Sequence, residues 1–107
     1  MLLGRHVVLP GGSLAIIGRN LEENGVLDRF LSRGVRLEAQ EVPGPTTLAL
    51  GEPPAADLEA AARLTARYGQ GRSRSCVAVG CRWPDGRTLR LEVPPSPPPG
   101  CRILKER

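Results

Sequence analysis

Residues 16–24 read IIGRNLEEN, and this stretch predicts a strand, a tight turn and the first turn of a helix. The apolar run Leu14–Ile17 includes β-branched residues and is typical of an interior strand. The glycine that follows it permits a sharp turn where a Cβ would clash. Asn20 is a favourable N-cap, and Glu23 stands three residues later, as in a capping box. The stretch is therefore expected to form a strand-to-helix corner that fixes Arg19 and Asn20.

Strand-to-helix corners often present backbone N–H groups to an anion. The two residues at this corner therefore have two interpretations. In the first, Asn20 only caps the helix and Arg19 only carries a solvated charge. In the second, both residues contact an anionic ligand. The spacing of the motif is compatible with either interpretation.

Two helices are predicted from apolar residues that recur at helical spacing. The first is expected from about residue 21 to residue 33, with Gly34 as its stop. Its apolar face contains Leu27, Phe30 and Leu31. The second is expected from about residue 56 to residue 68. Its apolar face contains Leu58, Ala61, Ala62, Thr65 and Tyr68.

About six to seven short strands are predicted where apolar residues alternate or cluster between turn formers. Residues 35–39 show the clearest alternation, with charged residues between the apolar ones. The other strands are expected at residues 5–9, 14–18, 46–50, 75–82, 87–93 and 101–104. Strands mixed with two helices predict an α+β fold with a mostly antiparallel sheet.

The length of 107 residues is that of one domain, so residues 1–107 are expected to fold as a single unit. Residues 94–100 read PPSPPPG and are too rich in proline for a helix or a strand ladder. We expect this segment to form an extended strap that leads to the last strand.

Charge is distributed unevenly along the chain. Residues 1–62 contain 5 Arg and 8 acidic residues, a net charge of −3, whereas residues 63–107 contain 10 Arg or Lys and 3 acidic residues, a net charge of +7. A basic half on a small domain indicates either an anionic partner, most commonly nucleic acid, or a solvated basic face.

Several functional classes lack support in the sequence. The three cysteines form no CxxC pair and the one histidine, His6, is distant from them, so neither a metal nor a cofactor is expected. No catalytic motif is present, and we expect no enzymatic activity. Without a signal peptide or an apolar run long enough to span a membrane, the chain is expected to be cytoplasmic.

Several motifs, in order, resemble the NFACT RNA-binding domain over roughly residues 4–104. The matching segments are Ile17–Asn20 with Asn24, the proline-glycine motif Val42–Thr46, the alanine-rich helix with its basic exit at 57–72, the strand Cys76–Arg82, and Pro99–Gly100. The family commonly has histidines after the first helix and after the proline-glycine motif, and residues 35–39 and 45–47 lack them. Roles attached to those histidines are therefore not transferred.

The resemblance implies a domain that binds tRNA or another structured RNA. Larger members of the family act in ribosome-associated quality control. A shorter form of the domain accompanies tRNA thiouridylase-type modification enzymes, and this chain resembles the shorter form more. A tRNA-modifying enzyme is therefore a further expected partner. The candidate RNA-binding residues are Arg19, Asn20, Asn24, Arg63, Arg67, Arg72, Arg74 and Arg82. Trp83, beside the last of these, either stacks on an exposed base or packs partly buried in the protein.

Two alternative functions remain at this point. The first is a protein-interaction module that docks a tRNA-modifying enzyme or a ribosomal protein through the strap and exposed strand edges. The second is a small enzyme that uses Cys76 or Cys81 as a nucleophile or sulfur carrier, although strand cysteines are usually buried and inert.

Overall fold

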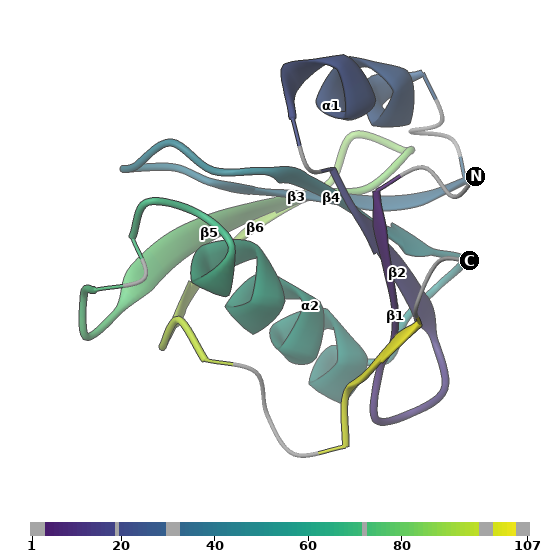
Figure 1. Ribbon diagram of the computed structural model, residues 1–107. Coiled ribbons are helices and arrows are strands. Elements are labelled where there is room, and N and C mark those ends of the chain that lie inside the picture. Colours follow the sequence, from purple (N-terminus) through teal and green to yellow (C-terminus); the bar gives the residue numbers. More distant parts are fainter. Residues whose placement is uncertain (1–3, 19, 30–32, 72, 97–99, 105–107) are drawn as a thin grey trace.

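The computed structural model describes residues 4–18, 20–29, 33–71, 73–96 and 100–104. Within these ranges the chain forms seven strands and two α-helices (Figure 1). The strands are β1 (Arg5–Val8), β2 (Leu14–Ile17), β3 (Gly34–Ala39), β4 (Thr46–Leu50), β5 (Val77–Arg82), β6 (Thr88–Val93) and β7 (Arg102–Leu104). The helices are α1 (Leu21–Asp28) and α2 (Ala55–Arg67). These elements confirm the predicted α+β fold.

All seven strands belong to one antiparallel sheet in the order β6-β5-β3-β4-β2-β1-β7. The alternation in β3 sets the two faces of the sheet, because neighbouring side chains in a strand point to opposite sides. Val35 and Leu37 are fully buried, whereas Arg36 is half-buried and Glu38 is exposed. The apolar set of β3 therefore faces the core, as the sequence pattern predicted.

The helix α2 packs against β3, β4, β5 and β6, and the curved sheet wraps around it (Figure 1). Its predicted apolar face is confirmed: Leu58, Ala61, Ala62 and Thr65 are buried, and Tyr68 just beyond the helix is half-buried. The helix α1 lies on the other side of the sheet, against β4. Because β4 is covered on both faces, its first four residues are all buried.

A buried pair of hydroxyl groups joins α2 to β4. The Thr65 and Thr47 hydroxyls lie 2.7 Å apart, and Thr65 Oγ1 is also 2.8 Å from the carbonyl oxygen of Ala61. Both threonines are fully buried. A buried hydroxyl needs a partner, since leaving it unpaired forfeits its interactions with water.

We expect Thr65→Val to lower the free energy of unfolding by about 1–3 kcal/mol, because it leaves the Thr47 hydroxyl without this partner at nearly constant side-chain volume. Urea denaturation followed by circular dichroism measures the change. The matched control is Thr88→Val on the exposed start of β6, which should change stability by less than about 0.5 kcal/mol. Equal effects of the two substitutions would contradict the expectation.

The strap joins opposite edges of the sheet, because β6 and β7 are the two outermost strands. On the way it contacts α2: Arg63 Nε donates a hydrogen bond of 2.7 Å to the carbonyl oxygen of Ser96, and Arg63 Nη2 lies 3.2 Å from Ser96 Oγ. The strap is therefore fastened to the exposed side of α2 before the chain reaches β7.

The first helix is shorter than predicted, and this part of the prediction was wrong. It ends at Asp28 rather than near residue 33, with Arg29 as its C-cap, and Gly34 begins β3 instead of terminating the helix. A Cβ on Gly34 would overlap the carbonyl oxygen of Ala49 in the neighbouring strand, so close strand pairing requires this glycine. Phe30 and Leu31 lie outside the described residues. The other elements begin and end within two residues of their predicted limits. None of the helices in the described ranges is long and apolar enough to cross a membrane.

Candidate functional site

The strand-to-helix corner forms as predicted at the end of β2. Asn20 has extended backbone angles, and its Oδ1 accepts a 2.9 Å hydrogen bond from the backbone N–H of Glu23. This is the predicted N-cap of α1. The Glu23 carboxylate accepts a hydrogen bond of 3.1 Å from the backbone N–H of Gly4, which ties α1 to the start of β1.

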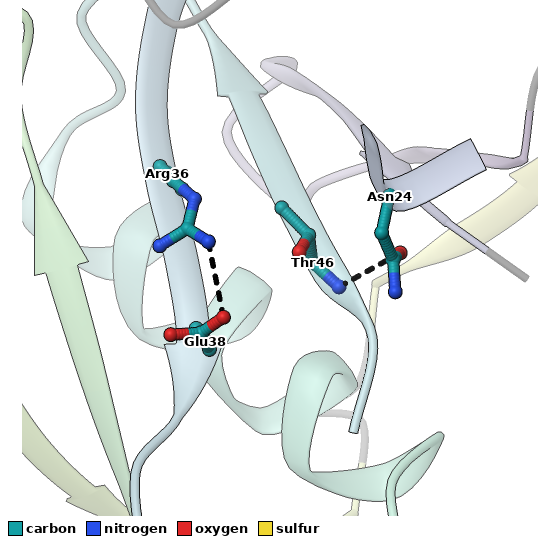
Figure 2. A network of polar contacts seen from close by, with 4 residues as sticks. All are labelled: Asn24, Arg36, Glu38 and Thr46. Atoms are coloured by element: carbon teal, nitrogen blue, oxygen red, sulfur yellow. Dashed lines mark hydrogen bonds and ion pairs between the residues drawn. The ribbon is translucent and has the colours of Figure 1, made fainter. Parts of the chain in front are cut away.

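Asn24 holds the corner against β4. Its Oδ1 accepts a hydrogen bond of 3.0 Å from the backbone N–H of Thr46, and its amide nitrogen points away from that bond (Figure 2). A Cβ on Gly18 would overlap this Asn24 oxygen, so the glycine makes room for the side chain. Gly18 N–H in turn donates to the Thr46 carbonyl oxygen at 2.9 Å. The end of β2, the helix α1 and the start of β4 are thus joined at one point.

An open pocket of about 590 Å³ lies at this junction and is called here the corner pocket. One side is formed by Gly18, Asn20 and Asn24. The proline-glycine motif, residues 43–45, and the exit of α2, residues 68–70, form other parts of its wall, and Arg5 of β1 completes it. The pocket therefore unites four parts of the chain that are separate in the sequence.

The proline-glycine motif and the exit of α2 fit closely together. Gln70 N–H donates a 2.8 Å hydrogen bond to the carbonyl oxygen of Pro43. A Cβ on Gly69 would lie 3.1 Å from both Gly44 Cα and the Pro43 oxygen, so a larger residue would force the two backbones apart. The two glycines permit this approach, which fixes one wall of the corner pocket.

Arg5, Tyr68 and Gln70 line the corner pocket but were not among the residues predicted for the site. The Arg5 guanidinium lies over the Tyr68 ring, with Cζ 4.7 Å from the ring centroid, at cation–π distance. Arg5 pairs with Ile17 in the β1–β2 hairpin, which places it beside the corner. Both strands of this hairpin were predicted, so pairing them in antiparallel register would have placed Arg5 beside the corner.

The structure brings together only some of the predicted RNA-binding residues. Asn20 and Asn24 line the corner pocket, and Arg67 directly precedes the Tyr68–Gln70 part of its wall. Arg67 and Arg74 are both exposed. Arg19 and Arg72 lie outside the described residues.

Two other predicted arginines lie away from the corner pocket. Arg63 binds Ser96 of the strap. Arg82 pairs with Arg36 in the sheet, so it projects from the face opposite the Val35 and Leu37 side chains. There it lines a second pocket of about 440 Å³ that includes Arg36 and Arg90.

Arg67, Arg74 and Arg82 are exposed, and none of them forms an ion pair with another described residue. The ion pairs found within those ranges involve other arginines: Arg36–Glu38 at 3.0 Å (Figure 2), Arg87–Asp85 at 2.9 Å and Arg90–Glu41 at 3.9 Å. An unpaired exposed guanidinium is available to a phosphate without first breaking an internal contact.

Trp83 is half-buried against the core, which agrees with the interpretation that it packs within the protein. The Arg87 guanidinium lies 5.0 Å from its ring centroid and occupies one face of the ring. Arg87 Nε also donates to Asp85 Oδ2 at 2.9 Å. This face of Trp83 is therefore already stacked.

The cysteines differ in exposure and give little support to nucleophilic chemistry. Cys81 is buried, and burial raises the pKa of its thiol to about 11, so the thiol is protonated at neutral pH. Burial also raises the pKa of Cys101, against a smaller opposing effect of Arg63. Cys76 is exposed. Among the described residues, no group of three or more His, Cys, Asp or Glu side chains is arranged to hold a metal ion.

Comparison with known proteins identifies the family. Residues 4–99 match the sequence model of the NFACT protein RNA-binding domain, and the chain therefore belongs to this family. The resemblance seen in the sequence motifs is thereby confirmed, and the family supports a general RNA-binding role and a non-catalytic domain. No curated protein sequence matches the chain.

A solved structure has a similar fold. It is the C-terminal part of the fibronectin/fibrinogen-binding protein from Streptococcus suis, with a TM-score of 0.77 and 18% sequence identity. The match covers 90% of this chain and 47% of that structure, so the chain spans about half its length. At this identity the likeness describes the fold alone.

Proposed function

We propose that this chain binds structured RNA, most specifically tRNA, at the corner pocket and the basic segment that follows α2. The observation that carries the proposal is the convergence of three segments on one opening. The corner, the proline-glycine motif and the exit of α2 carry the likeness to the family in the sequence, and all three line the corner pocket. Arg5 adds a guanidinium to the same opening.

Arg67 is the last residue of α2, and Arg74 lies in the segment between α2 and β5; both are exposed, and in this proposal they extend the RNA-binding surface beyond the pocket. Arg19 and Arg72 belong to the same segments in the sequence. Arg63 and Arg82 lie elsewhere, and in this proposal they add long-range attraction rather than contacts in the pocket. Because phosphate contacts carry little sequence information, the domain would recognise the shape of a folded RNA.

The proposed biological setting is tRNA modification of the thiouridylase type or ribosome-associated quality control. A domain of this kind would deliver tRNA to a modifying enzyme, either within the same polypeptide or as a separate partner. In this setting the chain supplies affinity and orientation, and the partner supplies the chemistry.

Titration of the chain with tRNA at several salt concentrations, followed by filter binding, tests this proposal. We expect the logarithm of the association constant to fall linearly with the logarithm of the salt concentration, with a slope of about 0.7–0.9 for each phosphate contacted. A DNA duplex of similar length serves as the comparison and should bind more weakly, because it lacks the shape of folded RNA and its 2′-hydroxyl groups. Failure to bind tRNA at low salt would refute the proposal.

A protein-docking function is the second candidate, and the edge of the sheet favours it. β6 is an outer strand of six residues, and Leu89 on it is 45% exposed. A free strand edge with an exposed apolar side chain can pair with a strand of another protein. The occupant in this case would be a tRNA-modifying enzyme or a ribosomal protein, and Leu89→Lys would weaken its binding while leaving the affinity for tRNA intact.

A further inference from the structure

The orientation of two asparagine side chains determines which of their atoms can face a ligand. Asn20 Oδ1 accepts from Glu23 N–H, and Asn24 Oδ1 accepts from Thr46 N–H. A backbone N–H can only donate, so the carboxamide oxygen must occupy each of these bonds. The NH₂ group of each asparagine is therefore left as a donor, and both residues line the corner pocket.

Several polar groups of the corner pocket are available as donors. The Arg5 guanidinium has no acceptor, and no Asp or Glu is among the described residues that line the pocket. Two carbonyl oxygens nearby are already engaged, since that of Pro43 accepts from Gln70 N–H and that of Asn20 accepts from Asn24 N–H. A ligand that offers several acceptors and a negative charge suits this lining best.

We propose that the corner pocket binds a phosphate group of the RNA backbone, with the amide nitrogens of Asn20 and Asn24 and the guanidinium of Arg5 as its donors. This inference rests on the proposed RNA-binding function and adds the chemical group that the pocket recognises. The volume of about 590 Å³ exceeds what one phosphate fills.

Stability alone does not require asparagine at either position. Aspartate caps a helix as well as asparagine does, and its negative charge suits the N-terminal end of the helix dipole. At position 24, an aspartate oxygen would accept the Thr46 N–H in a stronger, charge-assisted bond. What aspartate lacks at both positions is the donor, so Asn→Asp separates the structural role of these residues from the proposed binding role.

Asn20→Asp and Asn24→Asp in the full chain provide the first test. Each is expected to leave the urea midpoint unchanged or slightly higher, and to weaken tRNA binding about tenfold at fixed salt, through the loss of a donor and the addition of a negative charge. Gln40→Glu is the matched control, because it makes the same amide-to-acid change at an exposed residue that lines the second pocket instead. We expect it to weaken binding by less than about twofold.

Side-chain amide signals in nitrogen-15 NMR spectra provide the second test. The chain contains only two asparagines and two glutamines, so the spectrum contains only four side-chain carboxamide NH₂ groups to assign. Inorganic phosphate and a short RNA are expected to shift the signals of Asn20 and Asn24, with Gln40 unshifted as an internal reference. Adenosine, which has no phosphate, should leave all four in place.

The outcomes separate this inference from the function on which it rests. If the wild-type chain does not bind tRNA, the proposed function fails. If the wild type binds tRNA but both aspartate variants bind equally well, the phosphate assignment alone fails. A shift of Asn20 and Asn24 signals by adenosine and not by phosphate would also overturn it, and would indicate a base in the pocket.

Discussion

Replacement of Asp57 by alanine is expected to lower the free energy of unfolding by about 2–4 kcal/mol. Asp57 is fully buried near the start of α2. Its Oδ1 accepts a hydrogen bond of 2.6 Å from Gly11 N–H, and its Oδ2 accepts one of 3.2 Å from Ser13 N–H. One carboxylate thus joins α2 to the β1–β2 turn, and its removal would leave two backbone donors without these acceptors.

Urea denaturation of Asp57→Ala beside the wild type measures this effect. Glu59→Ala is the matched control, since Glu59 is an exposed carboxylate two residues further along the same helix. The control should change stability by less than about 0.5 kcal/mol. A variant of Asp57 as stable as the control variant would show that the turn is held by other contacts.

The same carboxylate predicts a specific dependence on pH. Burial raises the pKa of Asp57, but hydrogen bonds from Gly11 and Ser13 lower it more, so the net value is below the ordinary 3.8. A depressed pKa in the folded state gives stability that is present above the unfolded pKa and is lost as the pH falls through the folded one. The stability difference between the wild type and Asp57→Asn should therefore be constant above about pH 5 and shrink below about pH 4. A difference that grows at low pH would contradict this assignment.

The double substitution Arg67→Glu with Arg74→Glu is expected to weaken tRNA binding by roughly a hundredfold at low salt. Both arginines are exposed: Arg67 ends α2, directly before the Tyr68–Gln70 wall of the corner pocket, and Arg74 lies in the segment that leads from there to β5. Loss of two phosphate contacts should also reduce the slope of the log–log salt plot by about 1.5. Filter binding over a range of salt concentrations gives both quantities.

Arg87→Glu with Arg90→Glu is the matched control for charge. It changes the net charge by the same amount, but these arginines form ion pairs with Asp85 and Glu41 and lie in and beside β6. We expect it to lower affinity much less and to leave the salt slope nearly unchanged. Equal losses from the two double variants would mean that net charge, rather than a defined surface, governs binding.

The elements of this fold could be predicted from the sequence because their signals are local. The alternation in β3 and the helical spacing of Leu58, Ala61, Ala62 and Thr65 each lie within one short segment. The end of α1 could not be predicted in the same way. Gly34 is typical of a helix stop in the sequence. In the structure a glycine is needed there because a Cβ would overlap the carbonyl oxygen of Ala49, which becomes its neighbour only when β3 pairs with β4.

The candidate site depended still more on contacts between distant residues. Asn20 and Asn24 belong to a local motif, and sequence reasoning found them. The Arg5–Tyr68 contact joins a strand to the exit of α2 through the arrangement of the whole sheet, which the sequence does not display. Arg63 and Arg82 were grouped with the corner because of their charge, although the strap and the alternation of β5 direct them elsewhere.

The pairing of β7 with β1 links the outermost strand of the sheet to the corner pocket. Leu104 stands opposite His6, one residue from the Arg5 that lines the corner pocket. β1 is thus held between β2 and β7, and its Arg5 reaches the opening where RNA is proposed to bind. A substitution that weakened the β1–β7 pairing would therefore also loosen the strand that carries one of the proposed phosphate donors.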